Sequence, residues 1–264
     1  KIGQFIITDL SEQDIQRVAA LNYPYEVVID DVKNYYVQQN FSSQPKNATC
    51  PGTSTGNTPP VPENFHVPST YGGYYKYNEM LQELDEMAAL YPNLISVKAP
   101  IHTFLTWENR PIYQVKISNN PNSNDGDPMV LYSAIHHARE PMSMSQLIYY
   151  MWYLLENYDT NPEVKYLIDH TQMLFVPCLN PDGYIYNETT DPNGGGMHRK
   201  NRNPSIGTTN KGVDINRNYS YGWGTTGTSA TTSNDTYRGP SAFSEPDTQA
   251  MRWLVQNNNF EMAF

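Results

Sequence analysis

The sequence predicts an α/β fold, in which a sheet is flanked by helices. From about residue 70 onward, apolar runs of strand length alternate with segments whose bulky apolar residues recur at helical spacing. Polar residues 136–140 follow the apolar run 129–135 and precede a helical pattern that starts at Met142. In an open α/β sheet, ligand sites form where strands end and helices begin. We therefore expect a site at this junction.

Length and composition place the chain among globular proteins. Its 264 residues can hold one domain, or one domain with a small appendage, and 38% of them are hydrophobic. The formal net charge of -10 argues against nucleic acid or an anionic membrane as a partner, and no apolar run approaches membrane-spanning length. Because the chain starts at Lys1 and shows no signal peptide, we expect a processed or engineered start. Cys50 and Cys178 lack metal-site spacing, so one buried and one exposed thiol, or a disulfide, both stay open.

The first forty residues predict a small β-α-β unit. Residues 5–7 and 26–30 have strand composition, a helix is expected over 11–21 with Ser11 as its cap, and 32–39 can add one or two helical turns. Such a unit is too small to bury a good core alone. Residues 41–69, rich in Pro, Gly and Thr, favour neither helix nor paired strand and predict a linker.

The remaining chain carries the α/β pattern. Met80, Leu84 and Met87 recur at helical spacing, and Pro246 just inside a helix that Ser244 caps marks a last helical start. A turn is expected at 180–183 and a loop over 188–212. Helices are predicted over residues 78–90, 143–158, 162–168 and 244–256, and strands over 94–97, 113–117, 129–135, 173–176 and from 260 onward.

His137 and Glu140 are the first candidates for a metal site. They are three residues apart, so a turn or a first helical turn can aim both side chains at one point. Imidazole nitrogen and carboxylate oxygen are good zinc ligands, and a catalytic site needs a third. His-x-x-Glu alone should occur by chance in roughly one chain in three of this size. The pair therefore needs support from other residues.

Two cationic clusters supply that support. Arg199, Lys200 and Arg202 lie in the predicted loop, and Arg217 follows Asp214 three residues later. Guanidinium groups bind carboxylates through paired, charge-assisted hydrogen bonds, so arginines near a His/Glu pair suggest an anionic substrate group. The alternative for the loop cations is a solvated surface, and for Asp214 a turn or cap.

Five motifs in this order resemble the zinc metallocarboxypeptidases of the carboxypeptidase A/B type. The resemblance covers about residues 71–264. It implies a carboxypeptidase-like, phosphorylase/hydrolase-like fold with a mixed sheet flanked by helices, here incomplete and preceded by the small β-α-β pro-region. The motifs are His137-Ala138-Arg139-Glu140, Asn180-Pro181-Asp182-Gly183-Tyr184, Arg199-Lys200-Asn201-Arg202, Val213-Asp214-Ile215-Asn216-Arg217-Asn218, and Gly239-Pro240 with Ser244-Glu245-Pro246.

The resemblance also implies roles for single residues. Carboxypeptidase A is the type case of a zinc site built from two histidines and one glutamate, so the ligand set is carried over from the family. By resemblance His137 and Glu140 bind one zinc ion, and Arg202 polarises the scissile carbonyl and holds its oxyanion. The other implied roles are the clamping of the substrate's terminal carboxylate by Asn216 and Arg217, the lining of the neighbouring subsite by Arg139 and more weakly Arg199, and the orientation of the His137 ring by Asp214.

The resemblance divides the chain into a partial inhibitory pro-domain (1–40), the linker (41–69) and the N-terminal portion of a catalytic domain (70–264). The family's third zinc ligand, general base, mobile tyrosine and selectivity residue lie further on than residue 264. We therefore expect a longer polypeptide, with weak zinc binding and no normal turnover by these residues alone.

The function implied by the resemblance is that of a secreted or periplasmic zinc exopeptidase. Its partners would be a peptide or protein with a free C-terminal carboxylate and its own pro-segment, with neither nucleic acid nor membrane involved. Two alternatives stay open. One is a non-catalytic carboxypeptidase-like module or inactive fragment, and the other is a deacylase of N-acyl amino acids.

Overall fold

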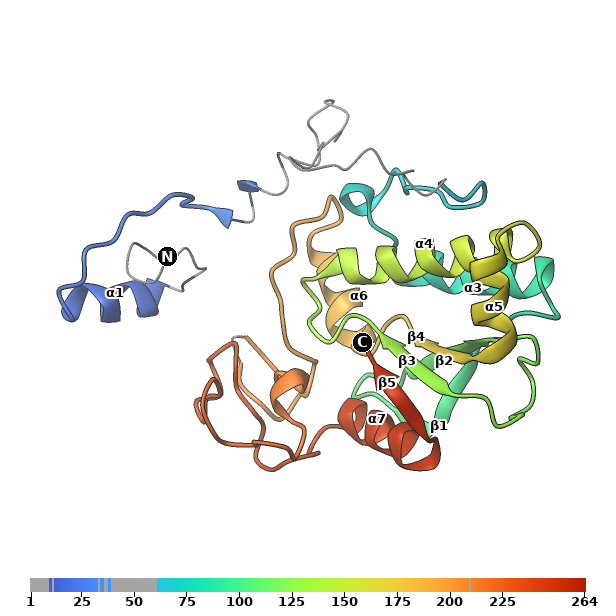
Figure 1. The fold of residues 1–264 in the computed structure, drawn as a ribbon. Coiled ribbons are helices and arrows are strands. Elements are labelled where there is room, and N and C mark those ends of the chain that lie inside the picture. Colours follow the sequence, from blue (N-terminus) through green and yellow to red (C-terminus); the bar gives the residue numbers. More distant parts are fainter. Residues whose placement is uncertain (1–9, 11, 33, 36–37, 39–60, 209) are drawn as a thin grey trace.

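A mixed five-stranded sheet forms the centre of the fold, as predicted (Figure 1). The computed structural model describes residues 10, 12–32, 34–35, 38, 61–208 and 210–264. In the order β1-β2-β4-β3-β5, the first three strands pair antiparallel, whereas β3 pairs parallel with both β4 and β5. The strands are β1 (Ala99–Leu105), β2 (Pro111–Ile117), β3 (Met129–Ser133), β4 (Gln172–Val176) and β5 (Phe260–Ala263).

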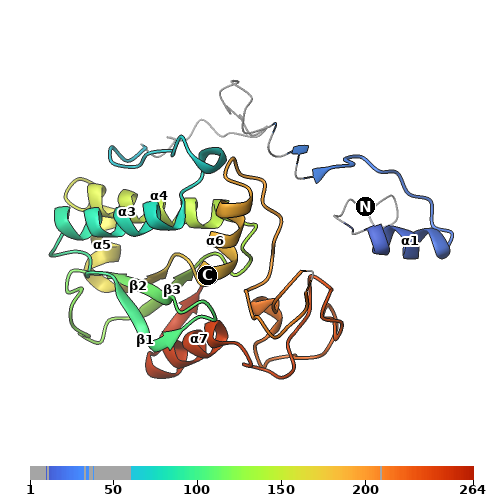
Figure 2. The ribbon, with the colours of Figure 1, turned by 180° about the vertical axis from the view of Figure 1, so that it is seen from behind.

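Helices cover both faces of the sheet, and the alternating side chains of β4 show how. Met173 and Phe175 belong to the core beneath α3, α4 and α5, whereas Leu174 and Val176 pack on the opposite face with Leu254 of α7. A strand buried on both faces has apolar residues throughout, as β4 does. Figures 1 and 2 show this layering from opposite sides. The helices are α3 (Tyr77–Leu90), α4 (Pro141–Asn157), α5 (Pro162–His170) and α7 (Pro246–Asn257).

These four helices confirm the predicted ones, with ends within two residues. The starts of α4, α5 and α7 each carry a proline in the first turn, where its missing N–H costs nothing. The Asn161 side chain caps α5 by accepting from two backbone N–H groups of the first turn. The predicted cap Ser244 is wrong, because Glu245 occupies that position, and its side chain accepts no hydrogen bond from the helix backbone.

Three local predictions were wrong or incomplete. The segment 180–183 is not only a turn: Asn180 caps α6 (Pro181–Thr190) by accepting from Gly183 N at 3.0 Å. Asn-Pro-Asp-Gly fits a helix start as well as a turn, and only the following packing decides. The predicted strand 94–97 is reduced to one bridge, between Ile95 and Ile117. Strand β1 was missed because only Ile101 of its seven residues is buried, which leaves no apolar alternation.

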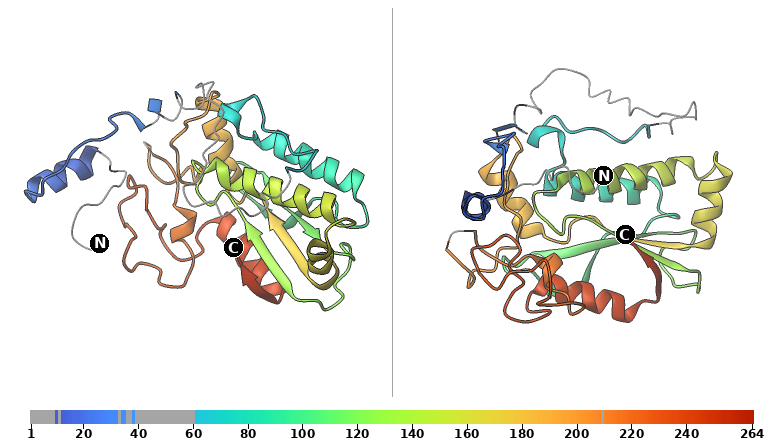
Figure 3. Two further views of the ribbon diagram at one scale, coloured as in Figure 1. Left: turned by 45° about the horizontal axis from the view of Figure 1, so that its top comes forward. Right: turned by 60° about the vertical axis from the view of Figure 1, so that its left-hand side comes forward.

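The N-terminal segment differs from its prediction. Helix α1 (Glu12–Ala20) confirms the helix expected there, and residues 32, 34, 35 and 38 are helical. Residues 26–30 are not a strand: no described residue pairs with them, and Val28 is 73% exposed. The strand expected at 5–7 and most of the linker lie outside the described residues. Figure 3 shows α1 to the side of the α/β body in both views. Within the described ranges, no helix is both long and apolar enough to cross a bilayer.

Candidate metal centre and substrate site

The site begins where β3 ends. Ile135 has φ 53°, a conformation that β-branched residues rarely adopt, and is held there by Asn180 N, which donates to its carbonyl at 3.1 Å. The chain then forms a turn in which Glu140 N donates to His137 O at 3.1 Å, and Pro141 starts α4. The predicted strand-to-helix junction is confirmed, and its turn brings the side chains of His137 and Glu140 to one point.

The contacts of the His137 ring leave one nitrogen facing Glu140. Its Nε2 lies 3.1 Å from Asp214 Oδ1, and its Nδ1 lies 2.9 Å from Glu140 Oε1. A carboxylate only accepts hydrogen bonds, and a neutral imidazole ring has one proton for its two carboxylate neighbours. With that proton on Nε2, toward Asp214, Nδ1 presents a lone pair to Glu140 Oε1. Two facing acceptors need a proton or a cation between them. Ligand atoms of one tetrahedral zinc ion lie roughly 3.3 Å apart for bonds near 2.0–2.1 Å, so this pair fits the ion.

Asp214 is the second acid that contacts the His137 ring. It is fully buried, and its Oδ2 accepts from Arg199 Nε at 3.0 Å, with Arg199 Nη2 at 2.9 Å. Burial alone would raise the pKa of Asp214, but the hydrogen bond from His137 and the charge of Arg199 outweigh it and lower the pKa below its ordinary value. Asp214 is also the N-cap of the short helix η2 (Ile215–Arg217), where its Oδ1 accepts from Asn216 N. Asp214 therefore contacts the His137 ring, and its ring-orienting role stays a prediction.

The four candidate arginines differ in what they already bind. Arg199 donates a hydrogen bond from Nε to Asp214 and forms an ion pair with it through Nη2. Its Nη1 lies 3.8 Å from Glu140 Oε1. Arg202 stacks on the Tyr186 ring with its guanidinium carbon 3.9 Å from the centroid. Among the described residues, the buried Nε of Arg202 has no hydrogen-bond partner, and the acid beside it, Glu108, is 3.7 Å away.

The other two arginines lie on the segments that flank the histidine. Arg217 follows Asp214 on η2 and donates from Nε to Gly227 O at 2.9 Å, while its neighbour Asn216 is exposed. Arg139 pairs with Asp235 at 2.8 Å. The structure thus brings His137, Glu140, Asp214 and Arg199 into one network, which we call the histidine cluster. Arg139 lies in the turn before α4, Arg202 in the loop 199–203 and Arg217 on η2. Their predicted roles stay predictions.

A third metal ligand is not found in the described part of the chain, where no group of three His, Cys, Asp or Glu residues could hold a metal ion. His136, next to the candidate ligand, points away from it and bonds to the Tyr219 hydroxyl at 2.9 Å. Cys178 is free and buried, and burial raises its pKa. Cys50 lies outside the described residues, so its state stays a prediction.

The sequence did not predict that a group of polar residues at the loop 199–203 and the start of α7 is buried. Glu245 and Asp247 are fully buried with Asn201, whose Nδ2 donates to both acids at 2.9 and 3.0 Å. We call Glu245, Asp247, Asn201 and Asn203 the buried acid cluster. Nothing local signals that these acids are buried, since acids at a helix start are usually exposed caps.

Two glycines let the same loop pass close to its neighbours. A Cβ on Gly183 would lie 2.4 Å from Lys200 O, and one on Gly212 would lie 2.0 Å from Asn201 O. Gly212 also has φ +98°, which side chains rarely adopt. The motif residues around Lys200 and Asn201 therefore occupy a position that only these glycines allow.

Comparison with known proteins points in one direction. The family model for zinc carboxypeptidase matches residues 80–264. A zinc carboxypeptidase of Saccharothrix mutabilis subsp. capreolus is 33% identical over 162 residues, covering 61% of this chain and 35% of that protein. Carboxypeptidase A2 of Mus musculus is 28% identical over 245 residues, covering 91% of this chain and 52% of that one.

Solved structures agree on the fold. The carboxypeptidase A of Helicoverpa armigera superposes with a TM-score of 0.67 at 24% identity, over 92% of this chain and 55% of that one. The chain spans between about a third and about half the length of these relatives. The family model covers most of the chain, and the chain therefore belongs to the zinc carboxypeptidase family.

Proposed function

We propose that the protein containing this chain is a zinc-dependent exopeptidase that hydrolyses the C-terminal peptide bond of peptides. The observation that carries the proposal is the 2.9 Å approach of His137 Nδ1 to Glu140 Oε1, with Nε2 of the same ring held by Asp214. These two side chains would hold one zinc ion. When bound, zinc would supply Lewis-acid polarisation of the scissile carbonyl and activation of the attacking water.

The surrounding residues of this chain bind and orient the substrate. Arg202, whose Nε has no hydrogen-bond partner among the described residues, donates to the oxygen of the scissile carbonyl as negative charge develops on it. Asn216 and Arg217 bind the free carboxylate of the peptide. Arg139 lines the next subsite. Arg199 lies against Asp214, and this supports an orienting role more strongly than a substrate contact.

Zinc content and substrate chemistry of the full-length protein test the proposal. We expect one zinc ion per molecule, and cleavage of an N-blocked dipeptide but not of its C-terminal amide. An N-acyl amino acid separates this activity from deacylation. Arg217→Glu should abolish cleavage, while Arg252→Glu, which changes an exposed arginine of α7, should leave it intact. Zinc-free protein, or full activity of Arg217→Glu, would contradict the proposal.

The two-ligand centre of the described residues favours a second candidate for these 264 residues alone. Two ligands bind zinc weakly, so this chain by itself is expected to act as a carboxypeptidase-like module that binds peptide C-termini without turnover. Isothermal titration of the isolated chain with a peptide and with its C-terminal amide measures this. Binding that ignores the carboxylate would rule out the module.

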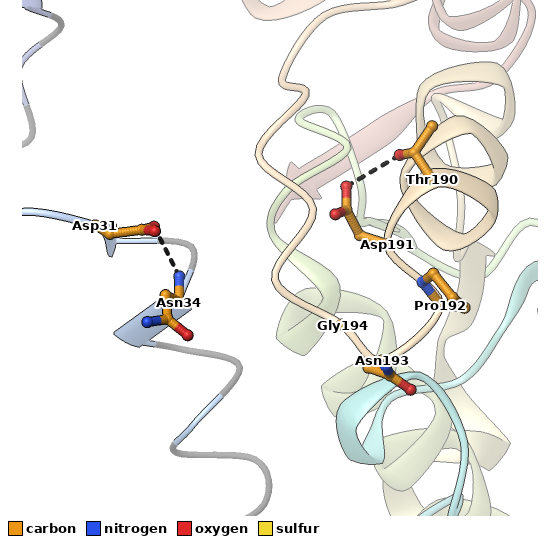
Figure 4. Close-up of a pocket in the computed structure, with 7 residues that line it drawn as sticks. All are labelled: Asp31, Asn34, Thr190, Asp191, Pro192, Asn193 and Gly194. Carbon is orange, nitrogen blue, oxygen red and sulfur yellow. Dashed lines mark hydrogen bonds between the residues drawn. The ribbon is translucent and has the colours of Figure 1, made fainter.

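The N-terminal segment is proposed to be part of an inhibitory pro-segment of a secreted enzyme. A hollow of about 490 Å³ lies between Asp31 and Asn34 on that segment and the turn after α6. In Figure 4 the drawn hydrogen bonds stay within each side, from Asn34 to Asp31 and from Thr190 to Asp191. Removal of residues 1–69 from the full-length protein should raise the peptidase rate, and an unchanged rate would contradict inhibition.

A further inference from the structure

Glu245 is a buried acid that the proposed chemistry does not use. Its carboxyl group accepts from four side chains: Trp107 Nε1 at 2.8 Å, Asn201 Nδ2 at 2.9 Å, Asn203 Nδ2 at 3.0 Å and Ser244 Oγ at 2.8 Å. The residue is fully buried, and in the described part of the chain no lysine or arginine pairs with it. A carboxylate buried without a cation is tolerated only when hydrogen bonds satisfy it, as these four donors do.

The position of Glu245 at a helix start does not explain these bonds. It is the N-cap of α7, where an acid commonly accepts from the first backbone N–H groups of its own helix. Its side chain makes no such bond and turns toward the loop 199–203 instead. The carboxyl group therefore accepts hydrogen bonds from the loop and none from the backbone of its own helix.

Glu245 holds the loop on both sides of Arg202. Asn201 precedes that arginine and Asn203 follows it, and both donate to Glu245 Oε2. Hydrogen bonds to an ionised acceptor are roughly twice as strong as neutral ones. With both neighbours attached to one buried group, the backbone of Arg202 has little freedom to shift.

The turn between β1 and β2 is attached to the same carboxyl group. Trp107 donates to Glu245 Oε2, and the next residue, Glu108, lies 3.7 Å from Arg202 Nε. The Glu108 backbone N–H is fixed in turn by Asp182 Oδ2 at 2.9 Å. The turn that carries Glu108 and the loop that carries Arg202 are thus both hydrogen-bonded to the carboxyl group of Glu245.

The segment that carries Asp214 is joined to this carboxyl group through Asn201. The Asn201 Oδ1 accepts from Val213 N at 2.8 Å, while its Nδ2 donates to Glu245. Asp214 follows Val213 and holds His137. Glu245 therefore connects the segments of Arg202 and Asp214, and its partners in the described part of the chain include neither of these two side chains.

We propose that Glu245 is a positioning residue, which sets the place of Arg202 relative to His137 and Glu140. The inference rests on the proposed exopeptidase function. Without the Glu245 carboxylate the loop relaxes, and Arg202 loses its alignment with the scissile carbonyl. Catalysis then suffers more than substrate binding, because the substrate's carboxylate is held by Arg217 on a different segment.

The test compares Glu245→Gln with Glu163→Gln in the zinc-loaded full-length protein. Glu163 is an exposed acid on α5, so its variant matches the change of charge. We expect Glu245→Gln to lower kcat on the order of 10–100-fold, since misplacement by about 1 Å costs that much, with KM changed less than threefold. A phosphonate peptide that mimics the tetrahedral state should lose affinity by the same factor as kcat/KM, while zinc content stays at the wild-type value. Glu163→Gln should match the wild type throughout.

The outcomes separate the two proposals. If the wild-type protein cleaves no C-terminal residue, the proposed exopeptidase function is contradicted, independently of any result for the Glu245 variant. A wild-type protein that cleaves, with unchanged kcat and phosphonate affinity in Glu245→Gln, overturns the positioning role. If Glu245→Gln does not fold, Asn203→Ala decides, because it removes one donor and leaves the carboxylate satisfied by three. A loss in kcat of about threefold or more, without a matching change in KM, supports the role, and an unchanged kcat overturns it.

Discussion

The histidine cluster and the buried acid cluster both include residues of the loop 199–203, and they satisfy their charges in opposite ways. In the first, Asp214 is paired with an arginine, while His137 Nδ1 and Glu140 Oε1 face each other as two acceptors. In the second, Glu245 is buried among neutral donors. The first arrangement is incomplete without a proton or a cation, whereas Glu245 is complete within the protein. The incomplete pair of acceptors marks where a ligand is expected, and the fully bonded Glu245 marks a residue that holds the geometry. Asp247 Oδ1 of the same cluster has no hydrogen-bond partner among the described residues.

The largest expected effect is a loss of kcat on substitution of Arg202, which tests whether a side chain with incomplete hydrogen bonding serves the substrate. Arg202→Lys in the full-length protein should lower kcat by about 10²–10³, or about 2.7–4 kcal/mol, because loss of one oxyanion donor has that cost. The free energy of unfolding should change little, since Nε has no hydrogen-bond partner among the described residues. Steady-state kinetics and urea unfolding measure the two quantities. Equal losses in both would place Arg202 among the structural residues.

The buried acid cluster should respond to pH. Burial raises the pKa of Asp247 to about 7, above its value of 3.8 in the unfolded chain. The stability from its neutral form is therefore present below about pH 4 and is lost as pH rises through about 7. Asp247→Asn stays neutral, so its free energy of unfolding relative to the wild type should rise between pH 4 and 7, on the order of 2–4 kcal/mol, and be flat above.

Chemical unfolding at several pH values measures this difference. Asp125→Asn, which changes an exposed acid, supplies the control and should show no such rise. A flat difference for Asp247→Asn would mean that this carboxyl ionises in the fold as it does in water.

The close packing of the loop against α6 predicts a smaller loss. Gly183→Ala would place a Cβ 2.4 Å from the backbone oxygen of Lys200, so the loop or the helix must shift. Overpacking of this kind costs about 1–3 kcal/mol. Gly126→Ala is a control for the change of composition, because its Cβ would meet nothing within 4 Å, although its φ of +88° adds backbone strain. Thermal unfolding should rank Gly183→Ala as the less stable variant. The reverse order would show that the loop yields easily.

The smallest expected effect concerns the partly exposed ion pair between Arg139 and Asp235. Arg139 and Asp235 pair with side chains that are 23% and 43% exposed, so solvent screens their attraction. A double-mutant cycle with Arg139→Gln and Asp235→Asn should give a coupling of about 0.2–1 kcal/mol in the free energy of unfolding. A coupling well above this range would show that the pair belongs with the buried networks.

Much of the fold could be predicted because its signals are local. Apolar runs, helical spacing and capping signals identified the helices α1, α3, α4, α5 and α7 and the strands β2, β3, β4 and β5. The spacing of His137 and Glu140 predicted that their side chains meet. The predictions were wrong for strand β1, which was missed, and for residues 26–30, which are not a strand, and the reason is the same for both. Whether an extended segment joins a sheet depends on a partner strand, and β1 has one in β2 while 26–30 has none among the described residues.

The sequence by itself determined the α/β class, the junction after β3 and, by motif order, the family. Only the tertiary structure decided that Arg199 binds Asp214, whereas Arg202 Nε has no hydrogen-bond partner among the described residues. It also decided that Glu245 and Asp247 are buried. The physical reason is the sequence separation over which each interaction acts. Periodicity and capping act within a few residues, whereas burial and hydrogen-bond partners come from segments such as 107, 201 and 245, which meet only when the sheet and α7 have packed.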